Sequence, residues 1–112
     1  MHEKLCSLLG LAMRAGKIKH GEDAVLQAVR SEQAKLVMLA NDASDATFKK
    51  MNDKCSYYHV KLHQISDRAT LGRCIGKEAR VSIAVIDEGF AKSMSKWLDT
   101  ENEVDHIEKR KG

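Results

Sequence analysis

Leu36-Val37-Met38-Leu39-Ala40 is an unbroken apolar run in the middle of the chain, bounded by Lys35 and Asn41. Such a run is typical of a strand that is covered on both faces, as in an α/β core. The polar residues after it, Asn41, Asp42 and Ser44, favour the N-terminal cap of a helix. We therefore predict a buried central strand that leads directly into a helix.

Helical patterns lie on both sides of this strand. Apolar residues recur every three or four positions, which is the spacing of a helix face that packs on a core. Glycine or a capping aspartate marks several expected ends, as at Gly16, Asp67 and Gly76. The expected helices carry their apolar faces at residues 5–13, 24–29, 48–58, 71–75 and 90–98.

The remaining apolar segments predict three more strands. A short one precedes Gly21, and longer ones cover residues 60–65 and 81–86. Strands that alternate with helices in one small domain imply helices on both faces of the sheet. We expect an α/β protein, a three-layer α/β/α sandwich with a four-stranded mixed sheet, as a single domain over residues 1–98.

Charge is distributed unevenly along the 112 residues. The whole chain has 19 Lys and Arg against 16 Asp and Glu, a net charge of +3. Residues 99–112 hold three basic and five acidic groups, which leaves residues 1–98 at +5. The polar composition of residues 99–112 predicts a flexible C-terminal tail.

The chain shows no pattern for membranes, metals or cofactors. Crossing a bilayer needs roughly 18 to 20 apolar residues, and neither such a run nor a signal-peptide pattern occurs. The histidines form no H-E-x-x-H motif, and the cysteines form no C-x-x-C pair. We expect a monomeric cytoplasmic protein that has no membrane contact, no bound metal and no cofactor.

The three cysteines, Cys6, Cys55 and Cys74, are odd in number, which argues against a disulfide framework. All three fall on expected apolar helix faces. We therefore predict that each is packed in the core.

Asp42 and Asp87 each follow an expected strand, where the ligand sites of α/β sheets gather. One interpretation is a phosphoacceptor or magnesium carboxylate site, which would make the protein a small enzyme. The alternative is helix capping, because each aspartate stands directly before a helical pattern. Since no nucleophile motif or nucleotide-binding loop accompanies them, we expect no catalytic residues.

A cluster of positive charge leads into the second expected helix. Arg14, Lys17 and Lys19 precede Gly21, and Glu22-Asp23 occupies the first helical turn. Helix N-termini attract phosphates, and basic side chains neutralise neighbouring ones. The carboxylates repel phosphate but accept hydrogen bonds from base amino groups, such as that of guanine. The turn is either a base-reading RNA contact or a solvated basic turn whose acids complement the helix dipole.

A second charged segment, Gly76-Lys77-Glu78-Ala79-Arg80, precedes the last expected strand. If the topology brings it beside the Gly21 turn, the two form a continuous rim that can grip a folded RNA by shape and phosphate contacts. Without that adjacency, the segment is a simple connection between a helix and a strand.

Four segments in order resemble the ribosomal L-seven-Ae family, over about residues 3–98, and the small bacterial YlxQ-type members most of all. They are Gly21-Glu22-Asp23, residues 34–42, residues 71–77 and residues 81–90. The resemblance implies a compact α/β/α domain that binds kink-turn RNA, an internal bend flanked by tandem G·A pairs, without catalysis. It also implies that the glycine turn and the following helix meet the G·A pairs, while the loop before the last strand contacts the extruded nucleotides.

The strongest family signature has Asn-Glu after the glycine turn and a lysine one helical turn later. This chain has Asp23, Ala24 and Gln27 at those places. Asp23 can still accept a hydrogen bond from a guanine amine, and Lys17 or Lys19 is a candidate for the missing cation.

The leading hypothesis is a non-enzymatic protein that binds structured RNA, such as a kink-turn in ribosomal RNA, within the ribosome or another ribonucleoprotein. The alternatives are a protein-interaction adaptor on the same fold and the small enzyme considered above. The predicted RNA-binding residues are Arg14, Lys17, Lys19, Gly21, Glu22, Asp23, Gln27, Lys77, Glu78, Ala79 and Arg80.

Overall fold

The computed structural model describes residues 1–98 of the chain. The predicted tail, residues 99–112, lies outside the described residues. Within the described part, no helix combines the length and the apolar character that crossing a membrane requires.

Helices and strands alternate along the described chain, and each element lies where the apolar spacing predicted one. The elements are α1 (Glu3–Arg14), β1 (Ile18–His20), α2 (Glu22–Arg30), β2 (Leu36–Leu39), α3 (Asp45–Tyr57), β3 (Lys61–Gln64), α4 (Arg68–Cys74) and β4 (Ser82–Val85), followed by a helix over residues 88–98.

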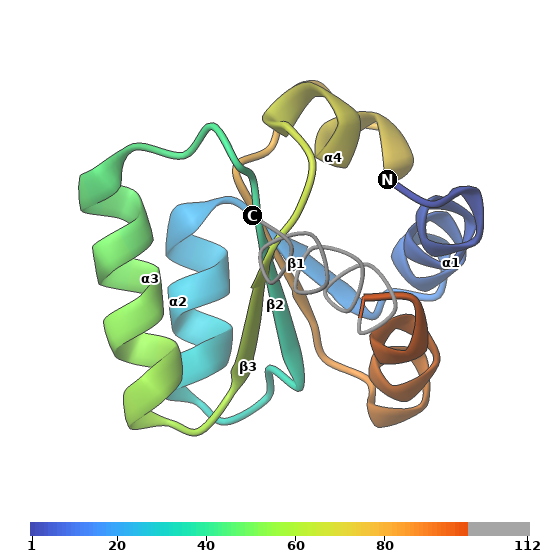
Figure 1. Ribbon diagram of the computed structural model, residues 1–112. Helices are drawn as coiled ribbons and strands as arrows, with labels where there is room; N and C mark the ends of the chain where they lie inside the picture. The colour runs from blue at the N-terminus through green and yellow to red at the C-terminus, as the bar shows by residue number, and fades with distance from the viewer. Residues whose placement is uncertain (99–112) are drawn as a thin grey trace, which may run out of the picture.

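The four strands form one mixed sheet in the order β1-β4-β2-β3 (Figure 1). β2 and β3 are parallel, with Leu36 opposite Lys61, whereas β4 is antiparallel to both β2 and β1. β1, β2 and β3 therefore finish at one end of the sheet, where β4 begins. We call this the Gly21 end, because Gly21 follows β1 there. The opposite end, where Lys35 precedes β2, is the Lys35 end.

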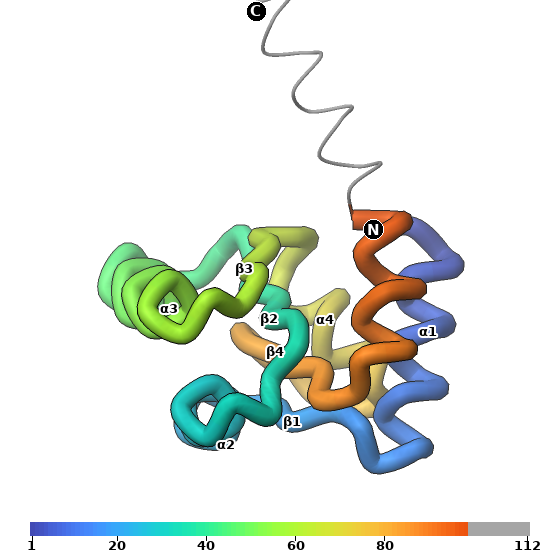
Figure 2. Tube along the Cα trace, turned by 90° about the horizontal axis from the view of Figure 1, so that it is seen from below, coloured from blue at the N-terminus to red at the C-terminus, as the bar shows by residue number. Residues whose placement is uncertain are grey.

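Helices cover both faces of the sheet, as predicted. α2 and α3 lie on one face, while α1, α4 and the helix 88–98 lie on the other (Figures 1 and 2). Successive side chains of a strand point to opposite faces. Accordingly, Leu36 and Met38 of β2 belong to the core under α1, whereas Val37 and Leu39 belong to the core under α2 and α3. Every residue of β2 and β4 is buried, so the expectation of a central strand covered on both faces is confirmed.

Polar side chains cap the N-termini of four helices. His2 Nδ1 accepts the N–H of Lys4 at 3.0 Å at the start of α1. Ser44 Oγ accepts the N–H of Thr47 at the start of α3. Asp67 accepts the N–H of Thr70 at 2.7 Å, and Asp87 accepts the N–H of Phe90 at 2.9 Å. Capping is therefore confirmed for Asp67 and Asp87.

Asp42 does not cap α3, contrary to the capping alternative. Its carboxylate accepts the backbone N–H of Arg68 at 3.2 Å and lies 3.3 Å from the Arg68 guanidinium. The side chain thus ties the loop after β2 to the first residue of α4. This role was missed because the contact spans 26 positions of the sequence.

The prediction that the cysteines form no disulfide is wrong, although Cys74 is buried in the core as expected. Cys6 of α1 and Cys74 of α4 form a disulfide, with their Cα atoms 5.1 Å apart. Counting cysteines missed the pair because 68 positions separate the two residues and only the tertiary fold brings the helices together. Cys55 is a buried free thiol, as predicted, and burial raises its pKa to about 11.

Candidate nucleic-acid interface

Gly21 forms the turn between β1 and α2 at the Gly21 end. Its φ of 91° and ψ of 152° are a conformation that is open essentially to glycine alone. Its N–H donates to the Ser82 carbonyl at 3.1 Å, which fixes the turn against β4. No side chain caps α2, and uncapped N–H groups at a helix N-terminus can bind an anion.

The segment of residues 76–80 is held against α4 by close backbone packing. The N–H of Lys77 donates to the Gly72 carbonyl at 2.9 Å. A Cβ on Gly72 would stand 1.8 Å from the Glu78 carbonyl oxygen, so only glycine permits this approach. Lys77, Glu78 and Ala79 are consequently displayed on the surface, where all three are exposed.

Arg80 joins this segment to the Gly21 turn. Its Nε donates to His20 Nδ1 at 3.0 Å, and its Nη1 donates to the Ala79 carbonyl at 3.0 Å. The pKa of His20 lies below its usual 6.5, mainly through burial and then through the charges of Arg80 and Lys77. His20 therefore accepts from Arg80 as a neutral imidazole.

The two charged segments lie side by side, which is the arrangement that a continuous rim requires. A hollow of about 250 Å³ between them is lined by Gly21, Glu22, Thr47, Ala79, Arg80, Val81 and Ser82. We call residues 20–22 and 76–80 together the interface rim. The Ser82 hydroxyl is buried and has no hydrogen-bond partner among the described residues, so the hollow has an unsatisfied polar group in its lining.

Glu22 is engaged by α3. Lys50 Nζ lies 2.9 Å from its Oε2, and the Thr47 hydroxyl is 3.5 Å from its Oε1. The contact places a lysine directly beside the Gly21 turn, which sequence reasoning did not anticipate. The sequence places Lys50 in the first two turns of an expected helix that follows a strand. It does not indicate which neighbouring element this lysine contacts.

Lys19 of β1 is exposed next to His20 of the rim, and Asp23 and Gln27 are exposed on α2. Lys19 and Gln27 line a shared hollow of about 280 Å³. Asp23 is exposed in the first turn of α2. The three side chains are therefore displayed beside the rim.

Arg14 and Lys17 lie elsewhere, although they were grouped with the rim in the sequence. Arg14 ends α1, and Lys17 precedes β1, where its carbonyl accepts the N–H of Ile86 at 3.0 Å. Lys17 and Gly21 are four positions apart along a mostly extended chain, which is about 13 Å. Both residues thus belong to the Lys35 end of the sheet.

The carboxylate-site hypothesis finds no geometric basis. Asp42 follows β2 at the Gly21 end, whereas Asp87 follows the antiparallel β4 at the Lys35 end. The two carboxylates cannot share a ligand across the length of the sheet. Among residues 1–98, no group of three or more His, Cys, Asp or Glu side chains could hold a metal ion.

Comparison with known proteins identifies the family. Residues 3–95 match the model of the ribosomal protein L7Ae/L30e/S12e/Gadd45 family. The RNA-binding protein YlxQ of Bacillus subtilis (strain 168) is 54% identical over 92 residues, which cover 82% of this chain and 92% of that protein. The RNA-binding protein YlxQ of Enterococcus faecium is 42% identical over 97 residues, or 87% of this chain and 93% of that protein.

A solved structure, of a protein with unknown function from Bacillus halodurans, has the same architecture. It matches with a TM-score of 0.84 and 43% sequence identity, and the match covers 88% of this chain and 99% of that chain. On the family model and these relatives, the chain belongs to the ribosomal protein L7Ae/L30e/S12e/Gadd45 family.

Proposed function

We propose that this protein binds a kinked, structured RNA at the interface rim and stabilises the bend. Membership of a family of non-enzymatic, RNA-binding proteins of ribosomal type supports RNA binding without catalysis. The observation that carries the proposal is the adjacency of the uncapped N-terminus of α2 and the basic segment 76–80 around one hollow.

The rim offers complementary chemistry for the two parts of a bend. The backbone N–H groups after Gly21 can hold a phosphate, and Lys77 and Arg80 add two cations beside it. The family resemblance assigns the G·A pairs to Gly21, Glu22, Asp23 and Gln27, and the extruded nucleotides to Lys77, Glu78, Ala79 and Arg80. Asp23 accepts from a guanine amine in this scheme, in keeping with its exposure.

Lys50 takes the place of the cation that the family signature supplies from α2. The Lys50 ammonium lies 2.9 Å from the Glu22 carboxylate, so this residue of α3 places a cation beside the first turn of α2. In the bound state we expect it to divide its hydrogen bonds between Glu22 and an RNA phosphate. We propose that this residue, more than Lys17, compensates for Gln27.

The test is the affinity of the purified protein for a kink-turn duplex and for the same duplex with its G·A pairs replaced by Watson–Crick pairs. We expect tighter binding of the kink-turn and a log–log salt slope of roughly −0.7 to −0.9 for each phosphate contacted. Lys19→Glu/Lys77→Glu should abolish binding, while the melting temperature changes little because both side chains are exposed and exposed charges contribute little to stability.

Lys49→Glu/Lys54→Glu is the matched control, since both residues lie on α3 outside the rim and the change in charge is the same. Equal affinity for the two duplexes would refute recognition of the kink. Equal losses in the two variants would refute the assignment of the site. Elution as a monomer on size exclusion would support the expected oligomeric state.

An adaptor role is the second candidate, favoured by one observation. A hollow of about 450 Å³ between α1 and the helix 88–98 is lined mostly by apolar groups, with Leu8, Leu11 and Trp97 among them. Leu11 is 48% exposed, which is unusual for a leucine on a packed helix. A protein partner that remains bound after nuclease treatment, and that Leu11→Glu releases, would establish this role.

A further inference from the structure

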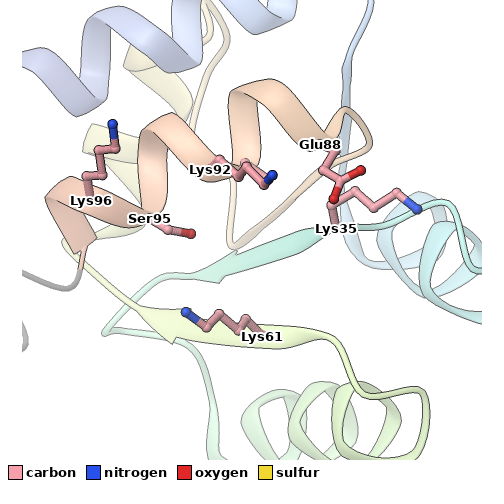
Figure 3. A pocket seen from close by; sticks show the side chains of 7 residues that line it. Lys35, Lys61, Glu88, Lys92, Ser95 and Lys96 are labelled. Atoms are coloured by element: carbon pink, nitrogen blue, oxygen red, sulfur yellow. The ribbon is translucent and has the colours of Figure 1, made fainter.

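A second basic surface lies at the Lys35 end of the sheet, away from the interface rim. A hollow of about 500 Å³ there is lined by Lys35, Lys61, Glu88, Ala91, Lys92, Ser95 and Lys96. Figure 3 shows Lys35 and Lys61 on the strand side and Lys92 on the facing helix 88–98, around a common space. Four lysines and a single glutamate therefore meet at one site that the interface rim does not include.

The sheet topology extends this site into a row of cations. β1, β2 and β3 all begin at this end, and a lysine stands at or directly before each start: Lys17, Lys35 and Lys61. The strand order β1-β4-β2-β3 places three strand spacings between the first and the last of them. At about 4.8 Å for each spacing, the strand starts that carry these lysines span about 14 Å. A row of this length fits a chain of phosphates better than one small anion.

The chemistry of the lining favours phosphate over base recognition. Lysine is a compact, hydrated point charge that binds phosphate and can also reach base edges, whereas most bidentate base contacts and base stacking use Arg, Asn, Gln or aromatic side chains. The described residues around this hollow include none of these four kinds. Ser95 adds a hydroxyl donor, and Glu88 is the one carboxylate that lines the hollow. Asp87, next to it after β4, is engaged as the cap of the helix 88–98. The surface is thus suited to a contact that is independent of sequence.

We propose that the row formed by Lys17, Lys35, Lys61 and Lys92 binds the phosphate backbone of a second RNA segment, other than the bend held at the interface rim. The inference rests on the proposed function, because it takes the ligand to be RNA. The two surfaces lie at opposite ends of strands of three or four residues, about 15 Å apart with their flanking residues. The row is therefore placed to contact RNA outside the bend that the rim holds.

The test uses the full chain, saturated with the kink-turn duplex, and a 20-nucleotide oligouridine as the second ligand. We expect the oligouridine to shift the backbone amide resonances of Lys35, Lys61 and Lys92 and to leave those of residues 76–80 unchanged. Lys61→Gln/Lys92→Gln should bind it about ten-fold more weakly at 0.1 M salt, with a log–log salt slope less negative by about 1.4. Its affinity for the kink-turn duplex should stay the same.

Lys4→Gln/Lys49→Gln is the matched control, because it removes the same charge. Both residues are exposed, and neither lines this hollow or the rim. Equal oligouridine affinities in the two variants would overturn the proposal. The proposal would also be overturned if millimolar inorganic phosphate displaced the oligouridine and caused the same resonance shifts. That result would identify a site for a small anion.

Failure of the proposed function can be told apart from failure of this inference. If the kink-turn duplex does not bind, the oligouridine titration is carried out on the free protein. Shifts confined to the Lys35 end then support the second surface alone, and shifts that appear only at the rim overturn it.

Discussion

His20 is the titratable group at the junction of the two rim segments, where its ring accepts a hydrogen bond from Arg80. Its Nδ1 accepts from Arg80, so the ring proton resides on Nε2. A second proton would remove the acceptor and place a positive charge beside Arg80 and Lys77. Protonation of the ring would therefore break this side-chain contact between β1 and the segment 76–80.

We predict that the pKa of His20 lies below 6.5 in the free protein and rises when RNA binds. Burial, Arg80 and Lys77 all disfavour the charged ring, whereas a nearby phosphate favours it. An NMR titration of the ring carbon resonances, with and without the kink-turn duplex, measures both values. Arg80→Gln should move the free value upward, and an unchanged pKa on adding RNA would contradict a phosphate near this ring.

The same shift gives a pH dependence of stability. Because the folded-state pKa is below the 6.5 of the unfolded chain, the unfolded state binds more protons as the pH falls through this range. The contribution of His20 is therefore fully present above about pH 6.5 and is lost as the pH falls toward the folded-state pKa. Urea unfolding between pH 5 and 7.5 should show a smaller decline for His20→Asn than for the natural sequence.

At the residue scale, the sequence identified groups with a local signature and missed those that depend on a distant partner. Gly21 could be predicted because a glycine before the acidic first turn of a helix is a local pattern. Lys50 and His20 could not, since their partners Glu22 and Arg80 lie 28 and 60 positions away. Lys17 was grouped with the rim for the same reason, because closeness in sequence hid the length of β1.

At the scale of elements, α4 acts as the support of the basic segment that follows it. Gly72 lets the chain fold back so that residue 78 rests on the helix, and the Cys6–Cys74 disulfide anchors the end of that helix to α1. The position of Lys77 and Arg80 therefore depends on contacts that these side chains do not make themselves. Disturbing α4 should move the rim without removing any of its charges.

We predict that Gly72→Ala weakens kink-turn binding and destabilises the fold. The new methyl group would stand 1.8 Å from a backbone oxygen, which cannot yield as a flexible side chain can. Overpacking of this kind costs about 1–3 kcal/mol, and urea unfolding measures it. Gly89→Ala is the control, because its Cβ meets only the Asp87 side chain, at 3.2 Å. Binding by Gly72→Ala at the natural affinity would show that α4 does not position the rim.

We predict that the disulfide contributes stability without being needed for the fold. Closing a loop across 68 positions restricts the unfolded chain by up to about 4 kcal/mol in the chain-entropy model. Urea unfolding with a phosphine reductant should therefore show a lower unfolding free energy and an unchanged circular dichroism spectrum before unfolding. Cys6→Ser/Cys74→Ser should be insensitive to reductant, and Cys55→Ser should remain sensitive. Three reactive thiols in the denatured, unreduced protein would contradict the bond.

Helical and strand periodicity could predict each element because burial repeats along the sequence with the period of the element. The order of the strands and the contact between α1 and α4 could not be predicted in this way. They depend on which apolar faces meet in space, and Cys6 and Cys74 look locally like any other core positions. The layers followed from the alternation of strands and helices, and the family resemblance implied the same α/β/α architecture without giving the strand order.

At the scale of the whole molecule, positive charge gathers at both ends of the sheet. The rim holds Lys77 and Arg80, and the Lys35 end holds the row of lysines. Residues 1–98 carry +5, and residues 99–112 lower the total to +3. The electrostatic fields of separate charges add over distances comparable to the Debye length. The net charge of the protein should therefore affect the association rate of RNA more than its dissociation rate.

We therefore predict that Glu101→Gln/Glu103→Gln, which raises the net charge from +3 to +5, speeds RNA association. Stopped-flow mixing with a labelled kink-turn duplex should show an association rate constant about two- to five-fold higher at 20 mM salt. At 0.5 M salt the Debye length shrinks to about 4 Å and the two rates should converge. The dissociation rate should stay the same if these residues touch neither RNA surface. A variant that dissociates more slowly but associates at the natural rate would instead indicate a direct contact between residues 101–103 and the RNA.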